Sequence, residues 1–105
     1  VVVSNANSCN YCTQAHSMLL QLMGFDEDKI NDLKNDFENF PEKEKAVLNY
    51  ALKINNSANK TTAEDHRILN ELGYDDKQIV EITSVVAAFN WANIIADALG
   101  TDMEA

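Results

Sequence analysis

Few residues in this chain can interrupt a helix, and the positions of those few divide it into helical segments. The 105 residues include one proline and three glycines, the residue types that most often end helices. Gly24, Gly73 and Gly100 each follow a segment with helical apolar spacing, as expected just past a helix end. Pro41 suits the first turn of a helix. No segment alternates apolar and polar residues between hairpin turns, so the sequence predicts an all-α fold.

The bounds of the predicted helices follow from capping side chains and from apolar residues spaced three or four apart. Ser8, Asp26 and Asp75 are the candidate caps, together with Thr61 or Thr62. The expected helices cover residues 8–23, 26–37, 42–55, 62–73 and 75–99.

The chain is long enough for one hydrophobic core and too short for two. Its 46% apolar content is typical of a folded globular protein. It opens on "VVVSN" without an initiator methionine, so we expect residues 1–105 to form a single helical domain that is truncated at its N-terminus. Three valines with no second strand to pair with cannot form a sheet, so Val1–Asn5 is interpreted as the end of a truncated helix.

Two segments of the chain resemble each other. "HSMLLQLMGFDEDKI" (residues 16–30) matches "HRILNELGYDDKQI" (residues 66–79) with one residue deleted. Both contain a His, an apolar helix, a Gly, an aromatic residue, an Asp and finally an Ile. Either a helix pair has been duplicated, or common helix punctuation has recurred by chance.

The last predicted helix is apolar around nearly its whole circumference, which indicates burial on several sides. In so small a chain this favours a homo-oligomer whose subunits pack on the helix. The alternative is an unusually central core helix.

The charge-free stretch of this last predicted helix, Ile82–Ala96, is too short to span a bilayer, so no membrane association is expected. The apolar residues are Ile82, Val85, Val86, Ala88, Phe89, Trp91, Ile94, Ile95 and Ala96.

Charge and cysteine content restrict the class of protein. The net charge of −9 repels phosphate backbones, which argues against a nucleic-acid partner. No basic segment followed by an apolar segment forms a visible signal peptide. Two cysteines three positions apart are not a secreted disulfide framework. These features favour a cytoplasmic protein in which the cysteine pair serves redox chemistry or metal binding.

The stretch "SCNYCTQAH" (residues 8–16) contains both cysteines and one of the two histidines. On a helix, Cys9, Cys12, His16, Leu19 and Met23 form one stripe, which we expect to face the core. Thiols at positions i and i+3 can form a disulfide with little backbone movement. The start of a helix favours a thiolate, and an imidazole one turn later can accept its proton.

Three interpretations of this cluster follow from the residues alone. A thiolate, a resolving thiol and a nearby base are what a two-cysteine peroxidase or disulfide reductase needs. Cys9, Cys12 and His16 could instead supply three ligands to a catalytic zinc, although structural zinc takes four. The third interpretation is a pair of buried structural thiols. His66 is expected in an exposed first helical turn, outside any site.

The segment "SCNYCTQAHSMLLQLMGF" resembles the core of AhpD-like alkylhydroperoxidases, in the carboxymuconolactone decarboxylase-like superfamily. "FNWANIIADALG" (residues 89–100) resembles a helix of the peroxidase-related branch. The resemblance implies duplicated helical pairs assembled as a trimer or a hexamer. It implies a peroxidase acting on small organic hydroperoxides without metal or organic cofactor. Cys12 would attack the hydroperoxide, Cys9 would form the disulfide, and His16 would transfer protons. A lipoylated or thioredoxin-like dithiol protein would be the reductant.

The chain departs from the family pattern at three places. The family's Glu upstream of the first cysteine falls before Val1. Asn10 and Tyr11 lie between the cysteines, where some members have a His, and Ile94 follows Asn93 where related proteins often have Arg. Two other functions stay open: a non-catalytic redox sensor or structural oligomer that uses Cys9–Cys12 as a switch, and a decarboxylase-like enzyme. The intact cysteine pair weakens the latter.

Overall fold

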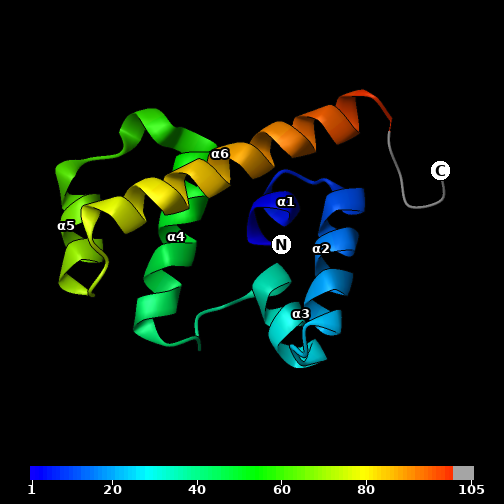
Figure 1. Ribbon diagram of the computed structural model, residues 1–105, viewed down its shortest axis with the longest axis horizontal. Helices are drawn as coiled ribbons and strands as arrows, with labels where there is room; N and C mark the ends of the chain where they lie inside the picture. The colour runs from blue at the N-terminus through cyan, green and yellow to red at the C-terminus, as the bar shows by residue number, and fades with distance from the viewer. Residues whose placement is uncertain (101–105) are drawn as a thin grey trace.

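The computed structural model describes residues 1–100, and these contain helices and no strand. The prediction of an all-α fold is therefore confirmed for this part of the chain. Figure 1 shows the last helix crossing above the others, with the N-terminal helices under one end and the middle helices under the other. The helices are α1 (Val2–Ala6), α2 (Asn10–Leu22), α3 (Glu27–Asn35), α4 (Glu42–Ser57), α5 (Ala63–Glu71) and α6 (Asp76–Ala98), with a 3-10 turn at Ala58–Lys60.

The helix starts agree with the predicted caps at most places. The Asp26 carboxylate accepts the Lys29 N–H at 2.7 Å, and Asp75 accepts that of Gln78 at 2.8 Å. Thr62 is the N-cap of α5, and α4 starts directly after Pro41. Because an oxygen at the cap satisfies an N–H that the helix cannot, these side chains fix where each helix begins.

The third helix is shorter than its apolar spacing predicts. It ends at Asn35, because Asp36 is extended and its carboxylate accepts the Glu38 N–H at 2.9 Å. This local turn competes with continuation of the helix. Phe37 therefore lies beyond the helix, where its ring is 6.4 Å from that of Phe40.

The two similar sequence segments adopt the same helix-ending turn. Gly24 follows α2 with a φ of 96°, and Gly73 follows α5 with a φ of 101°. In each case the next, aromatic residue donates its N–H to a carbonyl five positions back: Phe25 to Leu20, and Tyr74 to Leu69. The unit of helix, glycine, aromatic residue, capping aspartate and second helix thus recurs in the structure as well as in the sequence.

The buried apolar residues form small clusters between helix pairs rather than one large core. Val3, Ala51 and Val86 bring α1, α4 and α6 together. A second cluster joins α4, α5 and the start of α6 through Tyr50, Leu69 and Ile79. Helix α6 contributes to both clusters, and it connects the two halves of the molecule.

Helix α6 is buried along one side only within residues 1–100, so the alternative of a central core helix is wrong for the single chain. Its buried residues lie on one stripe, and residues 1–100 contain no further helix that covers the opposite side. The buried residues are Ile79, Val86, Asn93 and Ala96. The large apolar side chains left exposed are Val80, Val85, Phe89, Trp91, Ile94 and Ile95.

By length and composition alone, α6 could also cross a membrane. It has 23 residues, and its most apolar window has a mean hydropathy of 1.5. The charge-free stretch Ile82–Ala96 is too short by itself to span a bilayer, but the helix that contains it is longer. Only 22% of the window is buried in this chain. An apolar helix packed between subunits satisfies the same criteria.

Candidate functional site

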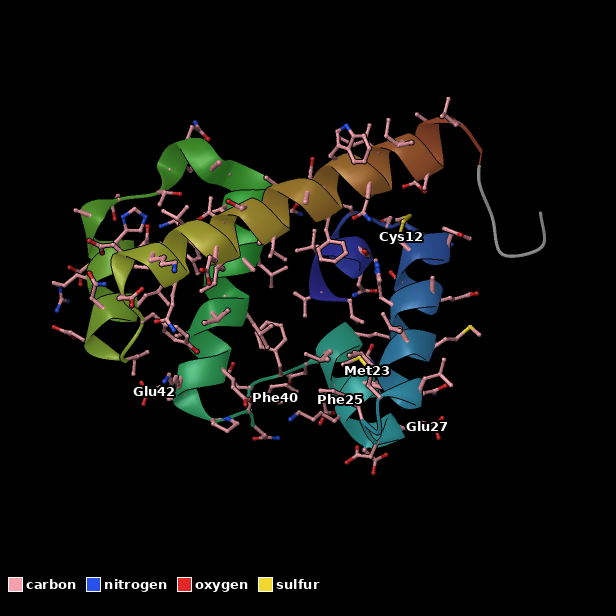
Figure 2. The ribbon with its side chains drawn as sticks, viewed as in Figure 1. Cys12, Met23, Phe25, Glu27, Phe40 and Glu42 are labelled. Carbon is pink, nitrogen blue, oxygen red and sulfur yellow. A yellow bond between two sulfur atoms is a disulfide. The ribbon has the colours of Figure 1, made fainter. Side chains whose placement is uncertain are left out.

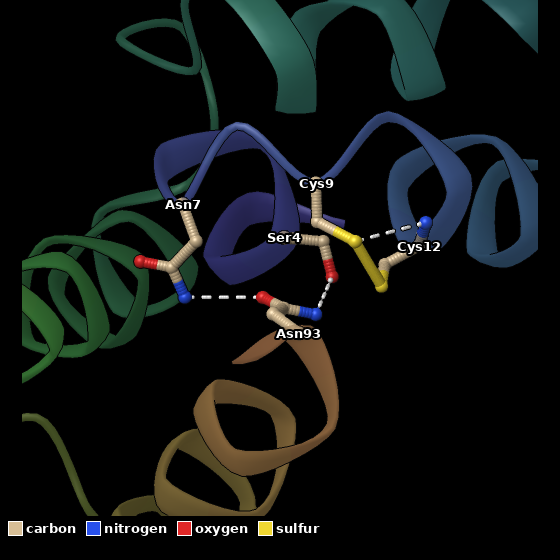
Figure 3. The surroundings of a disulfide bond; sticks show 5 residues. All are labelled: Ser4, Asn7, Cys9, Cys12 and Asn93. Atoms are coloured by element: carbon tan, nitrogen blue, oxygen red, sulfur yellow. Dashed lines mark hydrogen bonds between the residues drawn. A yellow bond between two sulfur atoms is a disulfide. The ribbon is translucent and has the colours of Figure 1, made fainter. Parts of the chain in front are cut away.

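Cys9 and Cys12 lie at the start of α2 and are joined by a disulfide, with their Cα atoms 5.3 Å apart. Cys9 is the N-cap residue, and its sulfur accepts the Cys12 N–H at 3.4 Å. Figure 3 shows this bond beside the disulfide. The spacing of the Cα atoms falls in the ordinary range for a disulfide. The expectation from the sequence that the pair could form a disulfide with little backbone movement agrees with this geometry.

Ser8 does not cap α2, contrary to prediction. Its φ of 58° places it in the left-handed region, whereas an N-cap residue needs an extended backbone. Cys9, with φ −87° and ψ 91°, has the backbone of a cap and takes the role with its sulfur. The turn from α1 to α2 therefore places Cys9 at the N-cap position of α2.

Both sulfur-bearing residues are almost fully enclosed. Cys9 is 0% exposed and Cys12 is 5% exposed. They pack against Ala96 of α6, with Tyr11 partly covering them. Cys12 is therefore the more accessible of the two, on the side where the end of α6 meets the start of α2.

The predicted core-facing stripe of α2 holds only in its first half. Leu19 is 52% exposed and Met23 is 66% exposed. Figure 2 shows Cys12 near the start of α2 and Met23 at its far end, close to α3. Helix α6 contacts α2 near the cysteines and His16, and Leu19 and Met23 further along the stripe stay exposed.

His16 lies one turn after Cys12, and its ring stands edge-on against Phe89 of α6, with 4.8 Å between centroids. Among residues 1–100, its Nδ1 atom is buried without a side-chain or backbone atom at hydrogen-bond distance. Burial is the largest effect that lowers the pKa of His16, while the Cys12 carbonyl acts in the opposite direction. A histidine with a lowered pKa is neutral at pH 7 and is able to accept a proton.

A group of asparagines beside the disulfide was not assigned a role from the sequence. Asn93 is 1% exposed; its Nδ2 donates to Ser4 Oγ at 3.1 Å, and its Oδ1 accepts from Asn7 Nδ2 at 3.0 Å. Asn90 donates to Asn55, which is also bonded to Asn7. The available signal was the presence of two amides in an apolar helix, because a buried amide needs partners.

His66 belongs to a different part of the molecule. It is exposed on α5, as expected, and its ring faces Tyr50 with 5.9 Å between centroids. Tyr50 Oη is 3.4 Å from His66 Nε2 and 2.9 Å from Thr83 Oγ1. The structure therefore does not bring His66 together with the cysteines.

An apolar cavity of about 500 Å³ opens between α1, α4 and α6. Phe89 lines it and also contacts His16, so one ring separates the cavity from the imidazole. Glu81 and Gln78 are polar residues of its lining. The other lining residues are Val1, Val2, Val3, Leu20, Leu33, Val47, Leu48, Ala51, Tyr74, Ile82, Val85 and Val86.

Residues 1–100 contain no group of three or more His, Cys, Asp or Glu side chains placed to hold a metal ion. In the disulfide form both sulfur atoms are bonded to each other, and neither is a free thiolate. The arrangement of Cys9, Cys12 and His16 is one that can exchange electrons and protons.

No family model matches the chain, and no curated protein matches its sequence. A solved structure does match: that of an uncharacterized peroxidase-related protein from Silicibacter sp. TM1040, determined at 1.70 Å resolution. The TM-score is 0.86 and the sequence identity is 27%, over 92% of this chain and 52% of that one. The present chain thus spans about half the length of its structural neighbour. Residues 1–100 have the helical fold of a peroxidase-related protein, and they carry a Cys-x-x-Cys disulfide within it.

Proposed function

We propose that this protein is an AhpD-like thiol peroxidase that reduces small organic hydroperoxides through Cys9 and Cys12. The observation that carries the proposal is the disulfide at the start of α2, in a fold that is similar to that of a peroxidase-related protein. A dithiol at a helix N-terminus is suited to this chemistry, because the helix end favours the thiolate. The proposal requires no metal and no organic cofactor.

In the reduced protein, His16 takes the proton of the Cys12 thiol. The Cys12 thiolate attacks the terminal oxygen of the hydroperoxide, the O–O bond breaks, and the alkoxide leaves as the alcohol with the proton from His16. Cys12 is oxidised to a sulfenic acid. The Cys9 sulfur then attacks the Cys12 sulfur, and the hydroxyl leaves with the Cys9 proton as water. The assignment of Cys12 as the attacking residue is supported by its slightly greater exposure.

The disulfide must be reduced before a second turnover. A lipoylated or thioredoxin-like protein supplies two thiols, one of which attacks the disulfide, and the donor leaves with a disulfide of its own. Such donors belong to a reducing compartment, so the proposal includes a cytoplasmic location. Neither nucleic acid nor a membrane is a partner in it.

The apolar cavity is the candidate site for the organic part of the substrate. Its volume of about 500 Å³ is within the range of small-molecule sites. Phe89 borders both the cavity and His16, so the proposal places the hydrocarbon group in the cavity and the peroxide end toward His16, past Phe89. This favours neutral alkyl or aryl hydroperoxides over charged ones.

The exposed apolar face of α6 supports a homo-oligomer, a trimer or a hexamer, as the functional form. Trp91 and Ile94 are more than half exposed in the single chain, and large exposed apolar patches are typical of interaction sites. A second copy of the chain packed on this face would cover them close to the cysteines.

The test is a count of free thiols on protein that has been reduced and freed of reductant, before and after the addition of cumene hydroperoxide. We expect rapid loss of both thiols of each chain, with one hydroperoxide consumed per disulfide formed. A Cys9→Ser/Cys12→Ser double variant controls for direct oxidation of methionine. Thiols that persist for many minutes would contradict the peroxidase.

A redox sensor is the second candidate, and the near-complete burial of both cysteines favours it. A buried disulfide is reached slowly by a donor protein, which suits a switch better than a rapid cycle. In that case both thiols are lost, but hydroperoxide is not consumed beyond one equivalent when a dithiol donor is added. The oligomeric state would then differ between the reduced and oxidised forms.

A further inference from the structure

The turn that carries Cys9 is held from both sides by one side chain of α6. The Asn93 amide donates to Ser4 Oγ at 3.1 Å and accepts from Asn7 Nδ2 at 3.0 Å. Ser4 in turn accepts the Cys9 N–H on its carbonyl oxygen at 3.0 Å. Figure 3 shows Asn93 hydrogen-bonded to Asn7 on one side and to Ser4 on the other, next to the disulfide.

This turn has an unfavourable backbone that its surroundings must maintain. Ser8, between Asn7 and Cys9, has a φ of 58°, a region that non-glycine residues adopt rarely. Such conformations persist where neighbouring contacts determine them fully. On one side of Ser8, Asn7 donates to Asn93. On the other side, the Cys9 N–H donates to Ser4, whose hydroxyl accepts from Asn93. Asn93 is therefore connected to both sides of the turn.

Both polar atoms of the Asn93 side chain are used in this way, and the residue is 1% exposed, as is Ser4. A buried amide with both groups satisfied fixes geometry, because any movement leaves a group without a partner. We infer that Asn93 is a positioning residue for the dithiol: it holds the turn in the conformation that keeps Cys9 and Cys12 at disulfide-forming distance, and thereby favours the disulfide over the dithiol.

The energetic argument concerns the reduced state. With the turn held, the two Cα atoms stay near the 5.3 Å of the disulfide form, so closing the bond orders little additional backbone. Without Asn93 the reduced turn samples other conformations, and disulfide formation must then order it. The inference deepens the proposed function by naming what sets its redox equilibrium. It rests on the dithiol chemistry of that proposal and does not require peroxide turnover.

The test is the equilibrium of the wild-type chain and three variants with dithiothreitol, without peroxide. Two thiols of dithiothreitol become its cyclic disulfide while Cys9–Cys12 becomes two thiols, which are counted by maleimide labelling and mass. For Asn93→Leu, which keeps the volume and removes both hydrogen bonds, we expect the equilibrium to shift about tenfold toward the dithiol. Ser4→Ala removes one of the two bonds, and we expect a smaller shift in the same direction.

Asn90→Leu is the matched control. Asn90 lies one turn before Asn93 on α6 and donates to Asn55 at 2.9 Å. Asn55 is itself bonded to Asn7, so the variant perturbs the same helix and the same group of amides but leaves both hydrogen bonds of Asn93 in place. We expect a shift of less than about twofold, because the bonds from Asn93 to Ser4 and Asn7 still hold the turn. Circular dichroism establishes that each variant is folded. If Asn93→Leu does not fold, the shift in Ser4→Ala decides the question.

An unchanged equilibrium in folded Asn93→Leu would overturn the inference, and so would an equal shift in Asn90→Leu, which would indicate general loosening of α6. A wild-type disulfide that dithiothreitol does not reduce would overturn it too, together with the proposed dithiol cycle. If the equilibrium shifts as expected while wild-type protein fails to consume cumene hydroperoxide, the inference stands and the peroxidase proposal falls.

Discussion

The ring of His16 stands edge-on to the ring of Phe89, with 4.8 Å between their centroids and 84° between their planes. The contact joins α2 to α6, next to the disulfide. It partly removes the imidazole from water, and burial is the largest of the effects that lower the pKa of His16. The same contact therefore holds the histidine in place and keeps it in the proton-accepting form.

We expect the stability of the protein to fall as the pH falls through the titration of His16. In the folded chain the pKa of His16 lies below the ordinary histidine value of 6.5, so around and below that pH the unfolded chain binds more protons and gains relative stability. His16→Gln should flatten this dependence. Urea unfolding between about pH 7.5 and pH 5 measures it, with His66→Gln, away from the cysteines, as control. Equal slopes for wild type and His16→Gln would be inconsistent with the lowered pKa.

Single cysteine variants separate the two steps of peroxide reduction. We expect Cys12→Ser to consume no hydroperoxide, because the attacking thiolate is gone. Cys9→Ser should consume one equivalent and stop at the sulfenic acid, because no thiol is left to resolve it. Mass spectrometry of the dimedone adduct on Cys12 identifies that product. Full turnover in both variants would exclude the mechanism, and the reverse pattern would exchange the two roles.

The two glycines of the repeated turn should be equally intolerant of a side chain. A β-carbon at Gly24 meets no atom within 4 Å, and at Gly73 it meets only the flexible end of Lys43. The penalty is therefore set by the positive φ of each, and we expect Gly24→Ala and Gly73→Ala each to destabilise the fold by about 1–2 kcal/mol. Thermal unfolding measures this, with Ser84→Ala on exposed helix surface as control. A neutral Gly24→Ala would show that the turn relaxes to another conformation.

Trp91 reports directly on what covers α6. It is the only tryptophan of the chain and is 67% exposed in the single chain. In the proposed oligomer we expect its fluorescence emission at short wavelength, and Trp91→Glu or Ile94→Glu should produce monomers in light-scattering measurements, because a charge cannot be buried unpaired at the interface. Asn31→Glu adds the same charge to an exposed polar position on α3, away from α6, and should leave the assembly intact. Monomeric wild-type protein would contradict the oligomer.

The helices could be predicted from the sequence because local chemistry determines them. Asp26 and Asp75 cap helices, and Gly24 and Gly73 end them, through bonds within a few residues. The prediction was wrong at Ser8 and Phe37, where a local backbone conformation that the apolar pattern does not reveal decides where the helix begins or ends. At Ser8 the backbone is left-handed, and at Phe37 a local turn of Asp36 ends the helix early. Competing conformations of short polar segments differ little in energy.

The surroundings of the candidate site were less predictable. The clustering of Cys9, Cys12 and His16 follows from helical spacing, and the structure brings these residues together at one end of α2. The contacts of Phe89 and Asn93 with that end join residues more than 70 positions apart, as the Ser4–Asn93 separation of 89 illustrates. Long-range contacts of this kind depend on how helices cross, which apolar periodicity alone does not specify. For the same reason Leu19 and Met23 were wrongly expected to be buried.

The hydrogen bond between Ser4 and Asn93 also bears on the order of events during synthesis. The two residues are 89 positions apart, and the N-terminal end of a chain is available to fold while the rest is still being made. During that time the segment that becomes α1 and the turn at Ser8 is present with both thiols, but without the helix that holds and covers it. The cysteine pair is thus open to oxidants and to disulfide exchange from the moment it emerges, and it becomes enclosed only when α6 has been synthesised and has docked.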